Sequence, residues 1–137
     1  MLPTLCLCTK LRRATRSVNR LYDDALAGVG VNAAQYSLLR NLERLGRPSI
    51  TELAEALGLD RSTLGRNLRV LEGKGLLALE GGEDQRNRLV SLTAAGRACL
   101  DQAKGDWAQV QEQLGQRLGP EKRAALMVLL DELEGLD

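Results

Sequence analysis

One segment of the sequence, LDRSTLGRNLRVLEGKGLL at residues 59–77, groups side chains that suit contact with DNA. If the segment is helical, at about 100° per residue, Leu64, Leu68 and Leu71 point to one side. The opposite side and its flank carry hydroxyl and guanidinium donors, from Ser62, Thr63, Arg66 and Arg69. Such donors can bond phosphates and base edges, and a two-pronged arginine contact reads guanine. A solvated helix often shows the same basic outer face, so this segment alone leaves both interpretations open.

The residues before this segment predict how it is positioned. The sequence SITE at residues 49–52 is a capping box, in which Ser49 and Glu52 each bond the other's backbone and begin a short helix. Gly58 ends that helix and Asp60 caps the next one. Two short helices joined by a glycine-containing turn form a helix-turn-helix, whose second helix can enter a DNA major groove.

A hairpin pattern follows in EGGEDQRNRLVSLT, residues 80–93. Short strands are expected on both sides of the polar turn, and a helix-turn-helix with a hairpin after it is a winged helix. The end of such a hairpin can reach phosphates or a narrow minor groove, which attracts an inserted arginine. We predict that Arg86 makes this contact and that Asp84 orients its guanidinium through a charge-assisted pair. Arg88, at the base of the strand, is expected to contact the DNA backbone or solvent.

The cysteines are the second group of side chains with possible chemistry. Cys6 and Cys8 fall in the first turns of a helix predicted over Leu5–Ala27, where the helix dipole favours a thiolate. Arg12 adds to that effect at Cys8, for which we expect a lowered pKa. Oxidation there could leave a sulfenic acid, a mixed disulfide, or a disulfide with Cys99 of a partner subunit. Free cysteines are also often small buried apolar residues, the interpretation that we favour for Cys99.

Helical patterns account for most of the remaining chain. A second helix is expected from Asn32 to Gly46, and a long one from Thr93 to about Leu118, with a bend or close packing near Gly105. The last segment, PEKRAALMVLLDELEGL, has an apolar stripe wider than one small domain needs, which favours a dimer. The alternative is that this helix covers the core of its own protomer. The stripe consists of Leu126, Leu129, Leu130, Leu133 and Leu136.

Composition narrows the possible functions. The 137 residues fit one domain, and their net charge of +1 gives no overall attraction to nucleic acid, so DNA contact must come from local basic clusters. The sequence contains no His, the commonest metal ligand and general base. It also has no phosphate-binding glycine loop and no nucleophile with an evident base. We therefore predict no metal site, no cofactor and no enzyme activity.

The N-terminal segment and the cysteine count bear on location. The apolar run in MLPTLCLC is too short to span a membrane, and the basic residues follow it instead of preceding it as in a signal peptide. Three cysteines without an export signal favour reduced thiols. We expect a cytoplasmic protein that does not enter the membrane.

The motif DQRNRLVSLTAAG, with the helix-turn-helix segment before it, resembles the MarR (multiple-antibiotic-resistance regulator) family. The wing of that family carries Asp-x-Arg followed by an apolar strand that ends in Leu-Thr. The matching residues are Asp84, Arg86, Val90, Leu92 and Thr93. The likeness continues in LRRATRSVNRLYDDAL and AAQYSLLRNL, so it covers nearly the whole chain.

This resemblance implies a mainly helical fold with a small β-hairpin, a winged helix-turn-helix whose terminal helices form a dimerisation region. The single domain would comprise a DNA-binding lobe at about residues 32–92 and dimerisation helices at about 1–30 and 93–137. The implied function is sequence-specific binding of a homodimer to a pseudo-palindromic operator in double-stranded DNA. Repression relieved by a small molecule or an oxidant would be usual. A winged-helix module that binds a protein partner and not DNA is the alternative, and it predicts little salt dependence.

Two routes of sensing follow from the resemblance. The segment around LRRATR is similar to the thiol-based organic-hydroperoxide-resistance branch, which places Cys8 at the reactive position and Tyr22 at a tyrosine that bonds the oxidised sulfur. Arg12 departs from that pattern, because a second tyrosine usually stands there. The other route is an apolar or phenolic ligand between the dimer helices and the winged helix, in a pocket that Tyr22 and Tyr36 would line.

Overall fold

The computed structural model describes residues 1–81, 84 and 87–136, and over these residues it is mainly helical with one antiparallel hairpin, as predicted. Leu77 pairs with Leu92 and Glu80 with Leu89 at the two ends of the hairpin ladder. The elements in chain order are α1 (Leu7–Leu26), the 3₁₀ turn η1 (Ala27–Val29), α2 (Ala33–Leu45), α3 (Ile50–Leu57), α4 (Arg61–Gly73), β1 (Leu77–Glu80), β2 (Leu89–Leu92), α5 (Ala94–Leu118) and α6 (Pro120–Glu134).

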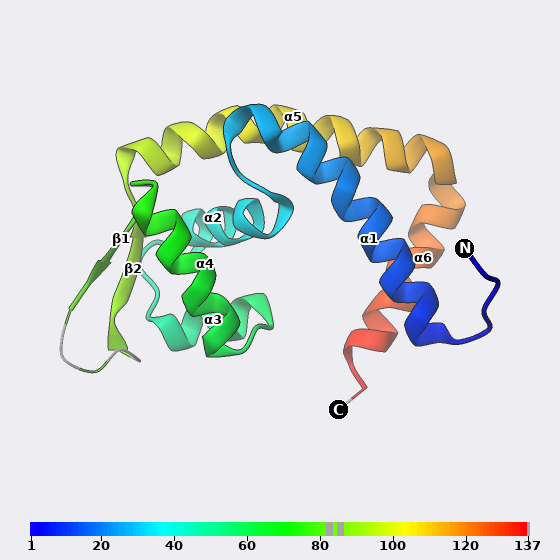
Figure 1. Ribbon diagram of the computed structural model, residues 1–137, viewed down its shortest axis with the longest axis horizontal. Coiled ribbons are helices and arrows are strands. Elements are labelled where there is room, and N and C mark those ends of the chain that lie inside the picture. Colours follow the sequence, from blue (N-terminus) through cyan, green and yellow to red (C-terminus); the bar gives the residue numbers. More distant parts are fainter. Residues whose placement is uncertain (82–83, 85–86, 137) are drawn as a thin grey trace.

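The long helix α5 links two parts of the molecule (Figure 1). At its N-terminal end lie α2, α3, α4 and the hairpin, which together we call the lobe. α1 packs across the middle of α5 and then runs away from it, and α6 turns away from its C-terminal end; we call these two helices the arms. α5 packs against α1, α2 and α6, so it holds the lobe and the arms in one body.

Four helix starts, those of α2, α3, α4 and α5, are fixed by the side-chain caps that the sequence predicted. Capping boxes form at Ser49 with Glu52, as expected, and at Asn32, where the partner is Gln35. Asp60 Oδ1 accepts a hydrogen bond from the Thr63 amide at 2.7 Å, and Thr93 Oγ1 from the Gly96 amide at 3.0 Å. Because these caps satisfy amides that have no partner within their helices, they set where α2, α3, α4 and α5 begin.

The core lies in the lobe and under the adjoining half of α5, and leucine dominates it. Leu64, Leu68 and Leu71 of α4 are buried, as the helical phase predicted. They join buried residues of α2, α3, the hairpin and α5, which include Leu38, Leu39, Leu42, Leu53, Leu77, Val90 and Leu100. Burial of each leucine stabilises the fold by about 1.5–3 kcal/mol, so the inner face of α4 is strongly specified.

The hairpin is attached to the α2–α3 loop, which sequence patterns did not indicate. The Val90 amide donates to the Pro48 carbonyl at 2.9 Å, and the Ile50 amide donates to the Arg88 carbonyl at 3.1 Å. Arg47 of the same loop also forms an ion pair with Glu80 on β1. The loop therefore extends the two-stranded sheet and fixes the hairpin relative to α3.

The expected close packing near Gly105 is wrong, because a methyl group there would meet nothing within 4 Å and α5 is continuous through it. The close contact is at Gly96 instead. A Cβ at this position would lie 1.9 Å from the carbonyl oxygen of Leu76. The backbone between α4 and β1 thus passes directly against the first turn of α5, and only glycine leaves room for it.

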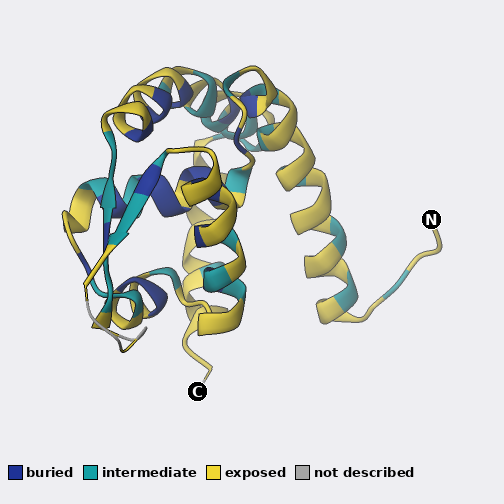
Figure 2. Ribbon diagram, turned by 60° about the vertical axis from the view of Figure 1, so that its left-hand side comes forward, coloured by how far each residue is buried: buried dark blue, intermediate teal, exposed yellow. Residues whose placement is uncertain are grey.

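The arms expose much of their apolar surface (Figure 2). No described residue of α6 is buried, and Leu129 is 55% exposed. On α1, which is one to two residues shorter at each end than expected, Leu26 alone is buried and Leu21 is 44% exposed. The alternative that α6 covers the core of its own protomer is therefore wrong. None of the described helices is long and apolar enough to cross a membrane.

We predict that Gly96→Ala lowers the free energy of unfolding by about 2–4 kcal/mol, because the added methyl group forces the backbone at Leu76 to shift. The matched control is Gly105→Ala on the same helix, where the methyl group meets open space. That control should leave the stability unchanged or raise it by up to about 1 kcal/mol. Urea unfolding at one fixed protein concentration measures both, and equal stabilities of the two variants would contradict the prediction.

Candidate nucleic-acid interface and effector sites

The donor side chains predicted on α4 lie together on its outer face. Ser62, Arg66 and Arg69 are exposed and Thr63 is partly exposed, opposite the buried leucines. Asp60 organises the start of this face, because its Oδ1 also accepts from the Ser62 hydroxyl at 2.9 Å. The hydrogen bond from the Thr63 amide, followed by that from the Ser62 hydroxyl, lowers the pKa of the Asp60 carboxyl.

The two arginines of α4 have different surroundings. Arg66 forms no ion pair with a described residue, and its Nη2 lies 3.5 Å from Thr63 Oγ1, so its guanidinium is available to a ligand. Arg69 lines a recess of about 190 Å³ between α4, α3 and the hairpin, together with Glu72 and Arg88. Arg88 is partly buried there, with Nη2 3.5 Å from the Leu79 carbonyl oxygen.

The wing residues predicted to contact DNA are only partly within the described structure. Arg86 lies outside the described residues, so its contact with DNA and its pairing with Asp84 stay predictions. Asp84 is exposed, and its carbonyl accepts a hydrogen bond from the Asn87 amide at 3.1 Å. Leu79 of β1 and Arg88, which directly precedes β2, border the recess that Arg69 lines.

A pocket of about 270 Å³ lies where α1 meets α2 and α5. Both tyrosines predicted to line a ligand site, Tyr22 and Tyr36, border it. Burial raises the pKa of each phenol, slightly offset by neighbouring arginines, so both hydroxyls are neutral hydrogen-bond donors at physiological pH. The Tyr22 hydroxyl donates to Gln111 Oε1 of α5.

Three further residues of this pocket were missed by sequence reasoning. Trp107 of α5 stacks on Tyr36 with ring centroids 5.7 Å apart, and Arg40 and Arg44 of α2 complete the lining. The one usable signal was the pair of basic residues one helical turn apart on a helix that also carries Tyr36. Their convergence with Trp107 depends on how α2 packs against α5, which spacing does not reveal.

A small ion network holds one side of the pocket. Glu43 pairs with Arg40 one turn earlier on α2 and with Lys104 of α5, whose Nζ lies 3.1 Å from Glu43 Oε2. The Lys104 hydrogen bond is the main reason that the pKa of Glu43 lies below its ordinary value. This network fixes the guanidinium of Arg40 at the rim, so the pocket offers cations beside a stacked aromatic pair.

The cysteines lie in contrasting places. Cys6 is exposed at the N-cap of α1, and hydrogen bonds from the Thr9 side chain and backbone lower the pKa of its thiol. Cys8 is also exposed. Cys99 is buried, and burial raises its pKa, as suits a small apolar residue. Cys8 and Tyr22 lie about 21 Å apart along α1, so a bond between them could form only between two copies of the chain.

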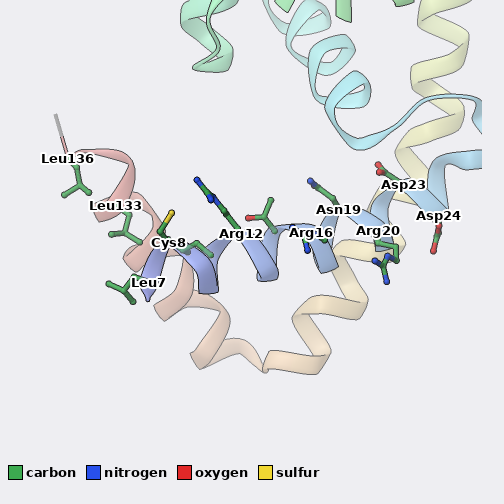
Figure 3. Close-up of a pocket in the computed structure, with 12 residues that line it drawn as sticks. Leu7, Cys8, Arg12, Arg16, Asn19, Arg20, Asp23, Asp24, Leu133 and Leu136 are labelled. Carbon is green, nitrogen blue, oxygen red and sulfur yellow. The ribbon is translucent and has the colours of Figure 1, made fainter. Parts of the chain in front are cut away.

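An open groove of about 990 Å³ runs between the arms, and Figure 3 shows its lining. Leu7 and Cys8 of α1 lie near Leu133 and Leu136 of α6 at one end, which is mainly apolar. Further along α1 the lining becomes basic and then ends in two acidic residues, in the order Arg12, Arg16, Arg20, Asp23 and Asp24. Among the described residues, no cluster of three or more His, Cys, Asp or Glu side chains is suited to hold a metal.

Comparisons with known proteins agree on one family. Residues 29–87 match the MarR family model. The DNA complex of the Mycobacterium tuberculosis transcriptional regulator MosR is 35% identical, with a TM-score of 0.81 over 94% of this chain and 96% of MosR. The DNA-bound repressor CouR is 32% identical, with a TM-score of 0.84 over 94% and 92% of the two chains. Bordetella bronchiseptica BpsR, whose DNA binding is regulated by 6-hydroxynicotinic acid, is 25% identical, with a TM-score of 0.87 over 100% and 99%.

We predict that the cap of α4 makes stability depend on pH through Asp60. Because its folded pKa lies below the ordinary 3.8, the ionised cap contributes stability that is fully present above that value and is lost as the pH falls through the folded pKa. Asp60→Asn keeps a capping oxygen without this titration. The stability of the wild type relative to Asp60→Asn should therefore fall between about pH 5 and pH 3, measured by urea unfolding.

The control for this prediction is Asp131→Asn, because the carboxylate of Asp131 bonds no described residue and lies outside the lobe. This substitution removes no hydrogen bond or ion pair to a described residue, so the variant should be about as stable as the wild type. A pH-independent stability difference between the wild type and Asp60→Asn would mean that the cap does not distinguish the two forms of the carboxyl group.

Proposed function

Because the chain belongs to the MarR family of winged-helix transcription regulators, it is a DNA-binding transcriptional regulator and not an enzyme, and we propose that it acts as a homodimeric repressor released by a small effector. Its place of action would be the cytoplasm, where a regulator reaches chromosomal DNA. The observation that carries the proposal is the outer face of α4, whose donors stand opposite a buried leucine stripe and beside an anchored hairpin.

In the proposed complex, α4 enters the major groove and the hairpin reaches the adjacent minor groove. Ser62, Thr63, Arg66 and Arg69 would contact base edges and phosphates. Arg66 is the best placed to read a guanine because it is exposed on the outer face of α4, whereas Arg69 lines the recess that holds Glu72 and Arg88. Arg86, oriented by Asp84, would contact the minor groove. Arg88 would contact phosphates from the base of the hairpin. MosR and CouR, which are similar to this chain, have been solved with DNA.

The arms support the homodimer. Their exposed leucines form more apolar surface than a monomeric protein of this size normally leaves open to water, and a two-fold interface would bury the same surface on both copies. Residues 1–30 and 93–137 would then form the dimerisation region, and residues 32–92 would form each DNA-binding lobe. Two lobes related by a two-fold axis fit a pseudo-palindromic operator.

The pocket between α1, α2 and α5 is the proposed effector site. It holds the Tyr36–Trp107 stack, the Tyr22 hydroxyl and two arginines, which suits a planar aromatic compound with an anionic group. A ligand there contacts both the first arm and the lobe, so it can change the angle between them. A regulatory ligand of this kind, 6-hydroxynicotinic acid, is known for the similar protein BpsR.

Oxidation of a thiol is the second proposed route of release. The exposed Cys6 and Cys8 lie at the start of the first arm, and Cys8 borders the groove between the arms. Oxidation of Cys8 would add a polar group to a surface that the dimer is expected to cover. A disulfide with Cys99 stays a prediction that would require the buried Cys99 to become accessible.

We predict that Arg66→Ala weakens binding to the operator upstream of the protein's own gene by about 1–3 kcal/mol and reduces its preference over unrelated DNA. Arg86→Ala should weaken binding to both DNAs more evenly, as a less specific contact does. Fluorescence anisotropy at several salt concentrations measures both effects. Wild-type affinity should fall steeply with salt, because phosphate contacts release counterions.

The control is Arg117→Ala, which removes one charge at the far end of α5 and should leave operator affinity within about twofold of the wild type. Equal affinities of all three variants would remove these contact assignments. Absence of salt-sensitive binding to every DNA tested would favour the alternative function, a winged helix that binds a protein partner and not DNA.

We predict that 6-hydroxynicotinic acid quenches the fluorescence of Trp107, the single tryptophan of the sequence, and lowers operator affinity. Tyr36→Leu should abolish both effects because it removes the ring that stacks on Trp107. Tyr22→Phe keeps the aromatic ring and removes only the hydroxyl, so it should weaken binding less than Tyr36→Leu does.

The same DNA assay distinguishes the thiol route. If operator binding resists the aromatic acid but is lost on treatment with an organic hydroperoxide, and survives that treatment in Cys8→Ser, the switch is a thiol. Protection by Cys6→Ser alone would place the reactive thiol at Cys6, where hydrogen bonds from Thr9 lower the pKa.

A further inference from the structure

The groove between the arms contains a row of cations that the protomer does not neutralise. Arg12, Arg16 and Arg20 are spaced by one turn along α1, line the groove and are exposed (Figure 3). None of them forms a hydrogen bond or ion pair with another described residue. A partner that fits this groove must therefore have an apolar face to contact the leucines and acidic side chains at its edges to pair with the three guanidinium groups.

The end of α6 has this character. Leu129 and Leu133 belong to its exposed apolar stripe, and at about 100° per residue Glu132 and Glu134 flank that stripe on either side. Asp131 falls on the opposite side of the helix. After Arg123 the described part of the helix carries no basic residue, so its last three turns are purely acidic and apolar.

The two features cannot satisfy each other within one protomer. The groove already includes Leu133 and Leu136 of the same chain, and across it no described ion pair joins α1 to α6. α1 crosses in front of α6 in Figure 1, and the view turned by 60° shows α1 standing apart from the rest of the molecule (Figure 2). The space between them is open to a helix of another molecule.

We propose that the acidic end of α6 from a second copy occupies this groove, with its Glu132 and Glu134 paired to the row of Arg12, Arg16 and Arg20. The inference rests on the homodimer proposed above and adds the contact that selects the partner. A two-fold interface makes the contact twice, because each copy supplies one basic groove and one acidic helix end. Asp23 and Asp24 at the far end of the groove repel further entry and so limit how deeply the helix inserts.

Charge pairing of this kind affects the choice of partner helix more than it affects the affinity of the dimer. Opposite potentials steer the approach of the two copies and penalise arrangements that place arginine row against arginine row. The leucines supply most of the affinity, as apolar surface does in permanent dimers. Dimers with foreign chains of the same fold are disfavoured unless those chains carry the same charge pattern.

The test reverses each charge set separately. The first variant is Arg12→Glu/Arg16→Glu, and the second is Glu132→Lys/Glu134→Lys. In each variant alone, both contacts of the dimer become repulsive, so the dimer dissociation constant should rise at least tenfold at low salt. In an equimolar mixture both contacts are attractive, and a heterodimer should form with a dissociation constant within about threefold of the wild-type value. Sedimentation equilibrium with one labelled variant measures all three.

Matched controls lie on the outer faces of the same helices. Lys10→Glu on α1 and Asp131→Lys on α6 change the charge by the same sign per residue, yet neither residue lines the groove. Both should dimerise like the wild type, and circular dichroism should show the same helicity in every variant.

The outcomes separate the inference from the dimer on which it rests. A wild-type dimer whose reversed variants dimerise normally, or whose mixture gives no heterodimer, would overturn the pairing and leave the dimer intact. A wild-type chain that stays monomeric would overturn both and would leave the groove to an acidic amphipathic helix of another protein.

Discussion

The burial of Leu64, Leu68 and Leu71 against the lobe is the constraint on which the DNA-facing surface depends. Each leucine gains about 1.5–3 kcal/mol by leaving water, whereas each exposed polar contact of α4 is worth far less. The rotation of α4 about its axis is therefore fixed by its inner face. The hydroxyl and guanidinium donors point outward because only that orientation of α4 buries the three leucines.

A second constraint lies where the first arm meets the lobe. The carbonyl of Gly30, which directly follows η1, accepts a hydrogen bond of 2.6 Å from Lys74 Nζ at the end of α4. Cys99 Sγ of α5 lies 3.9 Å from the Val29 carbonyl oxygen. Asp23 of α1 accepts from the Ala33 amide at the start of α2. This short turn thus connects the end of the DNA-facing helix to the arm that carries Tyr22. The proposed effector pocket lies at the same junction, so a ligand bound there would act on the contacts that join the arm to the lobe.

The sequence predicted the features that depend on interactions between residues close together in the chain. Caps at Asn32, Ser49, Asp60 and Thr93, the buried and exposed faces of α4, and the hairpin all follow from neighbours within a few residues, and the structure confirms them. What it could not predict depends on packing between distant segments. The aromatic stack needs α2 and α5 to meet at residues 36 and 107, and the glycine essential for packing proved to be Gly96 because its neighbour is the Leu76 carbonyl. Nothing in the spacing of the glycines along α5 separates Gly96 from Gly105.

The arms carry a second feature whose role could not be predicted from sequence patterns alone. The apolar stripe of α6 and the basic row of α1 are both visible in the sequence, and each alone is typical of an ordinary solvated or core-covering helix. Their significance comes from the fold, which places leucines of the stripe and the arginine row in one groove, where no ion pair between described residues neutralises the arginines. The leucines of this surface cost free energy while they are exposed to water. A purely apolar partner would bury the arginines without a counter-charge, which is also costly. In the proposed dimer a second copy would remove both costs, because each copy supplies an apolar, acidic helix end and receives one in its own groove.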